Sequence, residues 1–283
     1  MSFDSKNKNQ TINIEIDLIL QAIFQKYGYD FRNYSKAHVK RRLLNRISTS
    51  NLQSISELQH KVLHDQEYFE ILLRDLSINV TEMFRDPGFY LAMRKEVLPI
   101  LKTYPFFKVW HAGCSTGEEV YSFAVLLKEE GIYDRAQIYA TDFNRDVLEI
   151  AKKGIYPIDR IKEFTANYQA GGGTQSFSDY YMANYNSVIY DQSLKKNLVF
   201  AEHNLVTDSV FAEANLIICR NVLIYFNKEL QNRVVTLFND SLINGGFLGL
   251  GSKETLQFTN QAKNFDIINS DEKIYKKRIS KSI

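Results

Sequence analysis

Cysteine is scarce in this sequence, and the two that occur form no motif. Cys114 and Cys219 lie in separate apolar or small-residue runs, and no CxxC pair is present among the 283 residues. This distribution does not indicate a disulfide framework, and without a CxxC pair neither a structural zinc site nor any other metal centre is expected. A reducing cytoplasm is the expected location.

Long apolar runs and an excess of one charge are also missing. No stretch approaches the ~18 consecutive apolar residues of a membrane span, and the polar start MSFDSKNKNQ is unlike a secretory signal. The net charge is only +2, which is not a nucleic-acid signature. With 45% hydrophobic and 24% charged residues, the chain has the composition of an ordinary globular protein and not that of a disordered chain. We therefore expect no membrane insertion and no nucleic-acid partner.

The positive charge gathers in one short segment. Residues 26–46 contain seven Lys and Arg and a single acid, a net of +6, so the rest of the chain carries −4. One interpretation is a partner with an acidic surface, and the other is a solvated helix face.

Hydrophobic periodicity divides the chain into two parts. From about residue 15 to residue 102 the apolar positions follow the helical period, and the first ten residues resemble an unstructured tail. From Phe106 onward short apolar runs alternate with helical segments, which predicts a mostly parallel sheet with helices on both faces. We expect a helical domain at residues 11–103 and an α/β domain at residues 104–283.

Residues 157–197 fit neither pattern well. They contain three consecutive glycines at 171–173 and then a stretch rich in Tyr and Asn. A segment of this length without a strong pattern is typical of an insertion or a functional lid. We expect a helix near 158–168, a flexible loop, and a small hairpin that includes Ser187–Asp191.

A tight turn of small residues follows the first predicted strand. The segment VWHAGCSTGEEVYS, residues 109–122, lets a ligand approach the backbone at the start of a helix. The dinucleotide fingerprint GxGxxG is absent, and Glu118 and Glu119 would repel a pyrophosphate. They suit a positively charged group such as an amino-acid ammonium. The helix dipole alone also favours acids in a first turn.

An acidic residue ends the second predicted strand. Asp142, in IYATDFN, lies about 25 residues after the turn, where a carboxylate can accept both ribose hydroxyls of an adenosine ligand. The alternative is an Asp that caps the following helix, a role for which Asn144 competes. Because the pyrophosphate cradle is missing, S-adenosylmethionine (SAM) is favoured over NAD.

Polar residues also follow a third buried strand, in NLIICRNVLIYF, residues 215–226. Arg220 and Asn221 stand at its carboxyl end, where open α/β sheets bind ligands, and Tyr225 follows within a turn. The alternative is that Arg220 pairs with a carboxylate and Tyr225 packs structurally. A fourth segment, INVTEMFRDPGFY at residues 78–90, is by itself only a capping loop.

Together these segments resemble the CheR-type chemotaxis receptor glutamate O-methyltransferases over most of residues 15–279. The family's N-x-T-x-(F/M)-F-R stands at Asn79 to Arg85, and its C-R-N-V-x-I-Y-F stands at Cys219 to Phe226. Its S-T-G-E-E-P-Y-S stands at Ser115 to Ser122, with Val120 in place of proline. The resemblance implies a helical N-terminal domain and then a class I SAM-dependent methyltransferase domain, Rossmann-like and mostly parallel, with a small inserted β-subdomain.

The resemblance also implies site residues. SAM would be the methyl donor, with S-adenosylhomocysteine as product, and its contacts would fall on Asn79, Thr81, Arg85, Glu119, Asp142, Asn204, Leu205, Arg220 and Asn221. Glu118 is an adjacent alternative to Glu119. Arg85 and Tyr225 match residues that line the methyl-transfer site. The sequence departs from the family where GSKE, residues 251–254, displaces Glu254 from the expected G-x-S-E pattern.

The expected activity is methyl transfer to the γ-carboxylate of glutamates in methyl-accepting chemotaxis receptors. Their acidic helices would be attracted by Lys40, Arg42 and Arg46. A nucleic-acid methyltransferase is disfavoured, because no N-P-P-Y-like motif occurs and Cys219 does not follow a proline. A small-molecule methyltransferase and a non-catalytic SAM-binding sensor or scaffold remain alternatives. The sequence gives no indication of oligomeric state.

Overall fold

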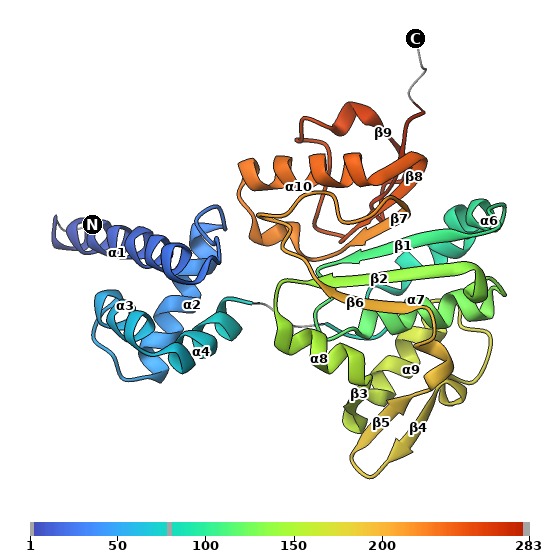
Figure 1. Cartoon of the computed structure of the whole chain (residues 1–283), viewed down its shortest axis with the longest axis horizontal. Coiled ribbons are helices and arrows are strands. Elements are labelled where there is room, and N and C mark those ends of the chain that lie inside the picture. Colours follow the sequence, from blue (N-terminus) through green and yellow to red (C-terminus); the bar gives the residue numbers. More distant parts are fainter. Residues whose placement is uncertain (1–2, 78–80, 280–283) are drawn as a thin grey trace. The chain divides into compact units, whose positions relative to one another are not determined.

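The computed structural model describes residues 3–77 and 81–279 (Figure 1). The chain divides into two compact units, Met1–Ile78 with Tyr225–Gln231, and Asn79–Ile224 with Asn232–Ile283. The expected boundary near residue 103 therefore differs from the observed one. Helix α5 (Pro87–Ala92), a π turn (Met93–Val97) and helix α6 (Leu98–Leu101) belong to the second unit. Their apolar side chains, including Phe89 and Met93, are buried in that unit's core.

The first unit is helical. Its elements are α1 (Phe3–Tyr27), α2 (Lys36–Thr49), α3 (Ile55–His64) and α4 (Gln66–Leu76). Helix α1 begins at Phe3, so the expected unstructured tail is helical in the residues described. The ring of Tyr27 on α1 stacks on Phe69 of α4, with centroids 3.7 Å apart. The segment Tyr225–Gln231 joins this unit, since Ser35 donates its backbone N–H to the carbonyl of Tyr225 at 2.7 Å.

The second unit contains a seven-stranded sheet. Its strands are β1 (Phe107–Ala112), β2 (Ala136–Asp142), β6 (Leu198–Glu202), β7 (Ala214–Cys219), β8 (Leu242–Leu250), β9 (Phe265–Asn269) and β10 (Ile274–Lys277). The order is β6-β2-β1-β7-β8-β10-β9, and β10 runs antiparallel to both of its neighbours. The prediction of a mostly parallel sheet is confirmed.

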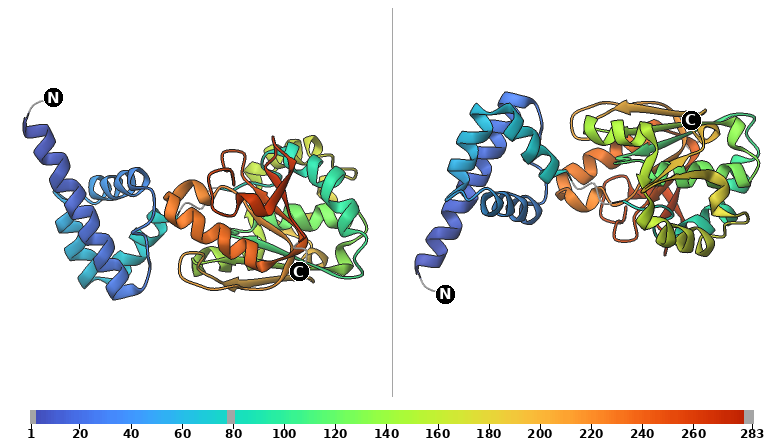
Figure 2. Two further views of the ribbon diagram at one scale, coloured as in Figure 1. Left: turned by 90° about the horizontal axis from the view of Figure 1, so that it is seen from above. Right: turned by 90° about the horizontal axis from the view of Figure 1, so that it is seen from below.

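Helices cover both faces of this sheet (Figure 2). They include α7 (Glu118–Glu129), α8 (Arg145–Lys153) and α10 (Lys228–Ser241). Successive residues of β1 face opposite helices: His111 contacts Phe123 of α7, and Trp110 contacts Phe238 of α10. Burial on both faces explains why this strand reads as an apolar run without alternation.

The insertion is a small antiparallel sheet with a helix. Strands β3 (Ile155–Pro157), β5 (Ser187–Tyr190) and β4 (Tyr181–Asn184) lie in that order, and α9 spans Ile161–Ala170. The expected helix and hairpin are present. The expected flexible loop is instead a packed turn, because Gly172 has φ +81° and a Cβ on Gly173 would lie 2.2 Å from the Tyr168 ring. Only glycine allows the chain so close to that ring.

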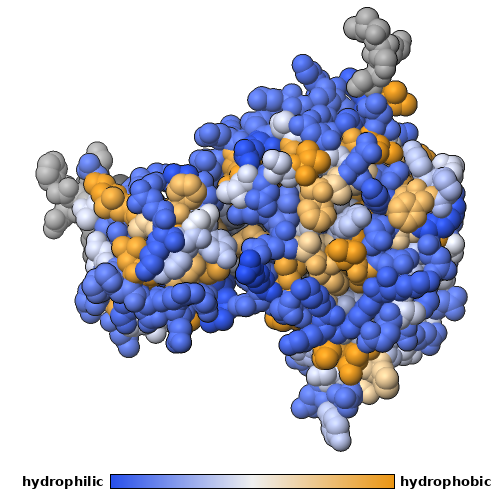
Figure 3. Space-filling view, in the orientation of Figure 1, coloured by the Kyte–Doolittle hydropathy of each residue, from blue (hydrophilic) through white to orange (hydrophobic). Residues whose placement is uncertain are grey.

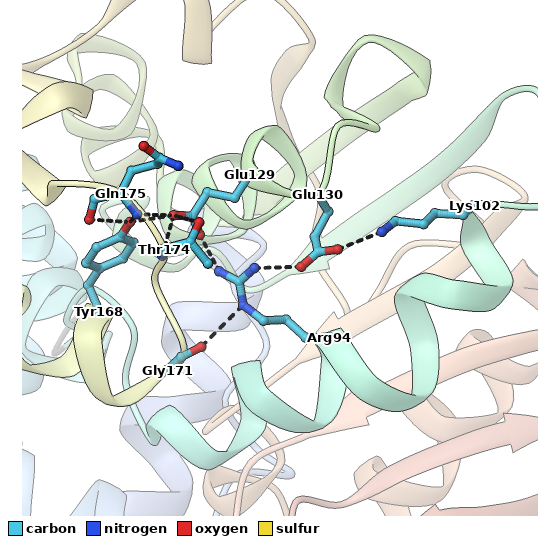
Figure 4. A network of polar contacts seen from close by, with 8 residues as sticks. All are labelled: Arg94, Lys102, Glu129, Glu130, Tyr168, Gly171, Thr174 and Gln175. Atoms are coloured by element: carbon cyan, nitrogen blue, oxygen red, sulfur yellow. Dashed lines mark hydrogen bonds and ion pairs between the residues drawn. The ribbon is translucent and has the colours of Figure 1, made fainter.

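A buried carboxylate fastens this turn to the core (Figure 4). The Glu129 side chain has no exposed surface and pairs with Arg94 of the π turn. It accepts the backbone N–H groups of Thr174 at 2.9 Å and Gln175 at 3.2 Å, and the Tyr168 hydroxyl. Three segments distant in sequence therefore meet at one side chain.

Replacing Glu129 by glutamine is expected to lower the free energy of unfolding by about 2 kcal/mol at neutral pH, because a charged acceptor is lost. Burial alone would raise the pKa of Glu129, but hydrogen bonds from Tyr168, Thr174 and Arg94 outweigh burial and hold the pKa below its ordinary value. This stability is therefore present above the unfolded-state pKa of about 4.3 and is lost as pH falls through the folded-state pKa.

Urea unfolding of both proteins at neutral pH and near pH 3 measures this difference. A deficit that stays the same in acid would contradict the prediction. Glu149→Gln is the control, since Glu149 is 61% exposed and forms only an i,i+3 pair with Lys152, and it should unfold like the wild type.

Exposed apolar residues occur in both units. The view in Figure 3 is mostly hydrophilic, with apolar side chains gathered over part of the sheet unit. Phe211, in the loop between β6 and β7, stacks on Trp110 with centroids 5.8 Å apart, and neighbouring Val210 is 49% exposed. Within residues 3–77 and 81–279, no helix is both long enough and apolar enough to cross a membrane.

Candidate cofactor site at the carboxyl edge of the sheet

Four neighbouring parallel strands end at one edge of the sheet. Asp142 is the last residue of β2, the turn containing Ser115 follows β1, Arg220 follows β7, and Asn204 comes two residues after β6. Carboxyl ends of parallel strands share an edge, so the three segments singled out in the sequence converge there.

The turn after β1 has a constrained backbone. Ser115 has φ +51° and Gly117 has φ +93°, both in the left-handed region. A Cβ at Gly117 would lie 2.8 Å from the Ala151 Cβ, so this position requires glycine. The pKa of buried Cys114, in the same turn, is raised by burial, which keeps the thiol protonated.

Asp142 holds this turn and does not cap the next helix. One carboxylate oxygen accepts the N–H of Ser115 at 3.0 Å, and the other accepts the N–H of Asn144 at 3.0 Å. The side chain of Asn144 caps α8 by accepting the N–H of Asp146 at 2.9 Å. Burial raises the pKa of Asp142, although its backbone hydrogen bonds act in the opposite direction. Asn144, and not Asp142, is therefore the residue that caps α8.

Arg220 is the centre of a buried ionic cluster. It donates to Glu119 at 2.9 Å and to Asp86 at 2.7 Å, and its guanidinium carbon lies 4.3 Å from the Phe89 ring centroid. His111 Nδ1 lies 3.2 Å from the other Glu119 oxygen. Burial alone would raise the pKa of Glu119, but the His111 hydrogen bond and the Arg220 charge outweigh burial and lower it. Sequence reasoning did not assign Asp86 or His111 to the site: the partner of Asp86 is 134 residues away in the chain, and the sequence around His111 indicates a packed strand residue.

Glu254 fixes the loop after β7. Its buried carboxylate accepts the N–H groups of Gly251 at 2.6 Å, Asn221 at 3.0 Å and Ile224 at 3.2 Å. Asn221 has φ +60°, so the loop needs such a restraint. Burial raises the pKa of Glu254 despite these bonds. In the sequence, Glu254 stood out only as a departure from the family's G-x-S-E pattern. Its position after a buried strand was the signal that could have assigned it to the site.

The segment before α5 completes this part of the second unit. Thr81 and Arg85 are half-buried in a stretch with no regular helix or strand, while Asn79 lies outside the described residues.

Glu118 accepts the Thr116 hydroxyl at 2.6 Å, and burial raises the pKa of Glu118. The remaining second-unit residues are Asn204, whose side chain accepts the Val206 N–H at 3.0 Å, and the buried Leu205.

Four predicted site residues belong to the first unit. Tyr225 lies there, and so do Lys40, Arg42 and Arg46 on α2. Arg46 forms an ion pair with Asp75, so its charge is already compensated. Lys40 donates to the Asn9 side chain at 3.2 Å.

Buried polar atoms indicate that the second-unit site is built for a ligand. Among the residues described, Arg220 Nε and Ser115 Oγ are buried without a hydrogen-bond partner. Such atoms usually find partners, and a bound molecule can supply them. The unpartnered Arg220 Nε and Ser115 Oγ, together with the glycine turn, fit the amino-acid end of a ligand. The Asp142 carboxylate fits a nucleoside end. No group of His, Cys, Asp and Glu within the described ranges has the arrangement of a metal site.

The strand order, the single reversed strand and the polar carboxyl edge define a class I SAM-dependent methyltransferase fold. The family model "CheR methyltransferase, SAM binding domain" matches residues 79–274, and "CheR methyltransferase, all-alpha domain" matches residues 14–77. The chain therefore belongs to the CheR methyltransferase family, and its cofactor is SAM.

Relatives of similar length support this assignment. Cher3 of Pseudomonas putida is 51% identical over 265 residues, which cover 94% of this chain and 97% of that protein. The "Chemotaxis protein methyltransferase" of Listeria monocytogenes is 29% identical over 81% of this chain and 85% of its own length. The Salmonella typhimurium protein of the same name is 27% identical over 88% and 85%.

Proposed function

We propose that this methyltransferase transfers the methyl group of SAM to the γ-carboxylate of glutamate residues in chemotaxis receptors, in the cytoplasm. The names of the Listeria and Salmonella relatives support a role in chemotaxis. The choice of a carboxylate substrate is supported by a pocket within the helical unit.

That pocket carries the proposal. It is lined by His38, Arg42 and Tyr225, together with Tyr34, Val39 and Leu76. His38 Nδ1 and Arg42 Nε are buried and have no hydrogen-bond partner among the described residues, and the His38 ring meets the Tyr225 ring edge-on at 5.2 Å. The pocket has room for about one water-sized group, which is the size of a single carboxylate oxygen. Arg42 Nε donates, and His38 Nδ1 donates in the tautomer that carries its proton there, so both nitrogens suit such an oxygen.

We assign the cofactor contacts to the second unit. Asp142 would accept the ribose hydroxyls, since each of its oxygens keeps a lone pair after bonding a backbone N–H. Glu119 or the adjacent Glu118 would face the ammonium group, and Arg220 with Asn221 the carboxylate end. Asn204 and Leu205 would contact the base, while Asn79, Thr81 and Arg85 would complete the methyl-donor side.

The chemistry requires little from side chains. When bound, SAM supplies an electrophilic methyl group on a sulfonium. A glutamate is already ionised at neutral pH, so no general base is needed and the protein's task is alignment. We assign Arg85 and Tyr225 to the methyl-transfer step, as the family motifs that contain them imply.

Tyr225→Phe is expected to lower turnover about tenfold or more and to leave the affinity for S-adenosylhomocysteine within about twofold, because one orienting hydrogen bond is lost. Steady-state kinetics and calorimetry separate the two effects. Unchanged turnover would remove Tyr225 from the reaction.

Charge reversal at Lys40 and Arg42 is expected to raise the KM for the receptor about tenfold, and this effect should shrink as salt rises. The control is Arg32→Gln, because Arg32 already pairs with Asp30 at 2.8 Å. A KM that ignores both the reversal and the salt concentration would show that α2 is only a solvated face.

One assay tests the activity itself. The full chain is incubated with methyl-labelled SAM and receptor-containing membranes, and the label is tested for release in mild base. Base-labile label on the receptor is expected, since glutamate methyl esters hydrolyse there. Label on a small molecule would favour the small-molecule alternative, and cofactor binding without any transfer would favour a sensor.

A further inference from the structure

The inserted subdomain makes polar contacts with the methyl-donor side of the site. Arg160, just before α9, donates from Nη1 to the carbonyl oxygen of Thr81 at 2.9 Å. Its other terminal nitrogen lies 3.4 Å from Glu82 and 3.3 Å from Glu163. The guanidinium also lies over the Phe164 ring, 4.8 Å from its centroid, which fixes its orientation.

Helix α9 supplies a second such contact. Asn167 donates from its side-chain amide to the carbonyl oxygen of Met83 at 3.1 Å. The next residue, Phe84, has φ +53° and is fully buried, with its ring centroid 5.2 Å from that of Tyr168 on α9. The Phe84 N–H donates to Ser122 of α7 at 2.9 Å. Residues 81–85 lie outside every helix and strand, and these side-chain contacts restrain their backbone.

The same subdomain also reaches the turn on the other side of the site. Tyr156 of β3 donates its hydroxyl to the carbonyl oxygen of Thr116 at 2.7 Å. This carbonyl lies between the two left-handed residues of the turn, Ser115 and Gly117. The insertion therefore restrains both backbone segments assigned to the cofactor.

We infer that Arg160 and Asn167 are positioning residues for SAM, acting through the Thr81 and Met83 carbonyls to hold residues 81–85 in their binding conformation. The inference rests on the proposed function only in assigning Thr81 and Arg85 to the cofactor. It makes the insertion part of the donor site: cofactor affinity depends on side chains that touch no cofactor atom.

The test measures binding of S-adenosylhomocysteine to the full chain by calorimetry, with no methyl acceptor present. Arg160→Gln and Asn167→Ala are each expected to raise the Kd about tenfold, the effect of losing one or two backbone-fixing hydrogen bonds. Turnover at saturating SAM should fall as well, because residues 81–85 include Arg85, which is assigned to the transfer step.

Arg135→Gln is the matched control. Arg135 also donates to two backbone carbonyls, those of Lys102 and Tyr104, both at 3.1 Å, but in a loop outside the site. It should bind S-adenosylhomocysteine like the wild type. If both Arg160→Gln and Asn167→Ala melt like the wild type and keep its Kd, the inference is wrong.

Two further variants distinguish a failure of this inference from misfolding and from a wrong assignment of the cofactor site. If Arg160→Gln does not fold, Arg160→Lys replaces it, because lysine retains the charge and one donor nitrogen. A Kd of Arg160→Lys above the wild-type value supports the inference, and a wild-type Kd overturns it. If Asp142→Asn loses affinity while the Arg160 and Asn167 variants do not, the proposed site stands and only this inference fails. If Asp142→Asn binds normally, the assignment of the site is at fault.

Discussion

Arg220→Met is expected to abolish detectable S-adenosylhomocysteine binding and to lower the free energy of unfolding by about 3–5 kcal/mol, the cost of breaking a buried ion pair. The Arg220 side chain is 2% exposed, and the substitution removes the shared cationic partner of Glu119 and Asp86. Urea unfolding and calorimetry measure the two effects.

The matched control for this substitution is Arg278→Met. Arg278 also pairs with a carboxylate, Asp266 at 2.8 Å, but the two side chains are 58% and 56% exposed. We expect a loss below about 1 kcal/mol, as for other exposed pairs. Equal losses in the two variants would show that the buried cluster has no special role.

Asp142→Asn is expected to weaken S-adenosylhomocysteine binding about 100-fold, because two charge-assisted hydrogen bonds to ribose are worth about 3 kcal/mol together. The substitution also turns an amide NH₂ toward one of the two backbone N–H groups that Asp142 accepts. Calorimetry on both proteins measures the loss.

Asp134→Asn is the control for this effect. Asp134 is 84% exposed and interacts with Lys196 at 3.4 Å, just before the amino ends of β2 and β6 and not at their carboxyl ends. Its substitution should leave the affinity unchanged. An Asp142→Asn protein that binds like this control would show that the carboxyl end of β2 does not hold the ribose.

The mostly parallel sheet and the convergence of three motifs could be predicted because both depend on local patterns. Apolar runs mark β1, β2 and β7, and the parallel arrangement then places Ser115, Asp142 and Arg220 at one edge. The tight turn before α7 was also predictable, since a run of small residues before a helix permits the left-handed backbone observed at Gly117.

Other features depended on contacts between distant residues. The boundary expected near residue 103 differs because the helix at 87–101 carries its apolar side toward the sheet unit, and periodicity does not say which core a stripe will join. The glycines at 171–173 are compatible with a flexible loop or a packed turn, and the partners Tyr168 and Glu129 decide between them.

The scarcity of cysteine and of long apolar runs already limited this protein to an ordinary globular chain without a disulfide framework. The sequence by itself then determined the family, the mostly parallel sheet and most proposed cofactor residues, because these follow from periodicity and from motifs a few residues long. Only the tertiary structure decided the partners of Arg220, the role of Glu254 and the link from Arg160 to Thr81. Each includes a pair of residues more than 30 positions apart in the sequence, and such pairs are set by the packing of the whole unit.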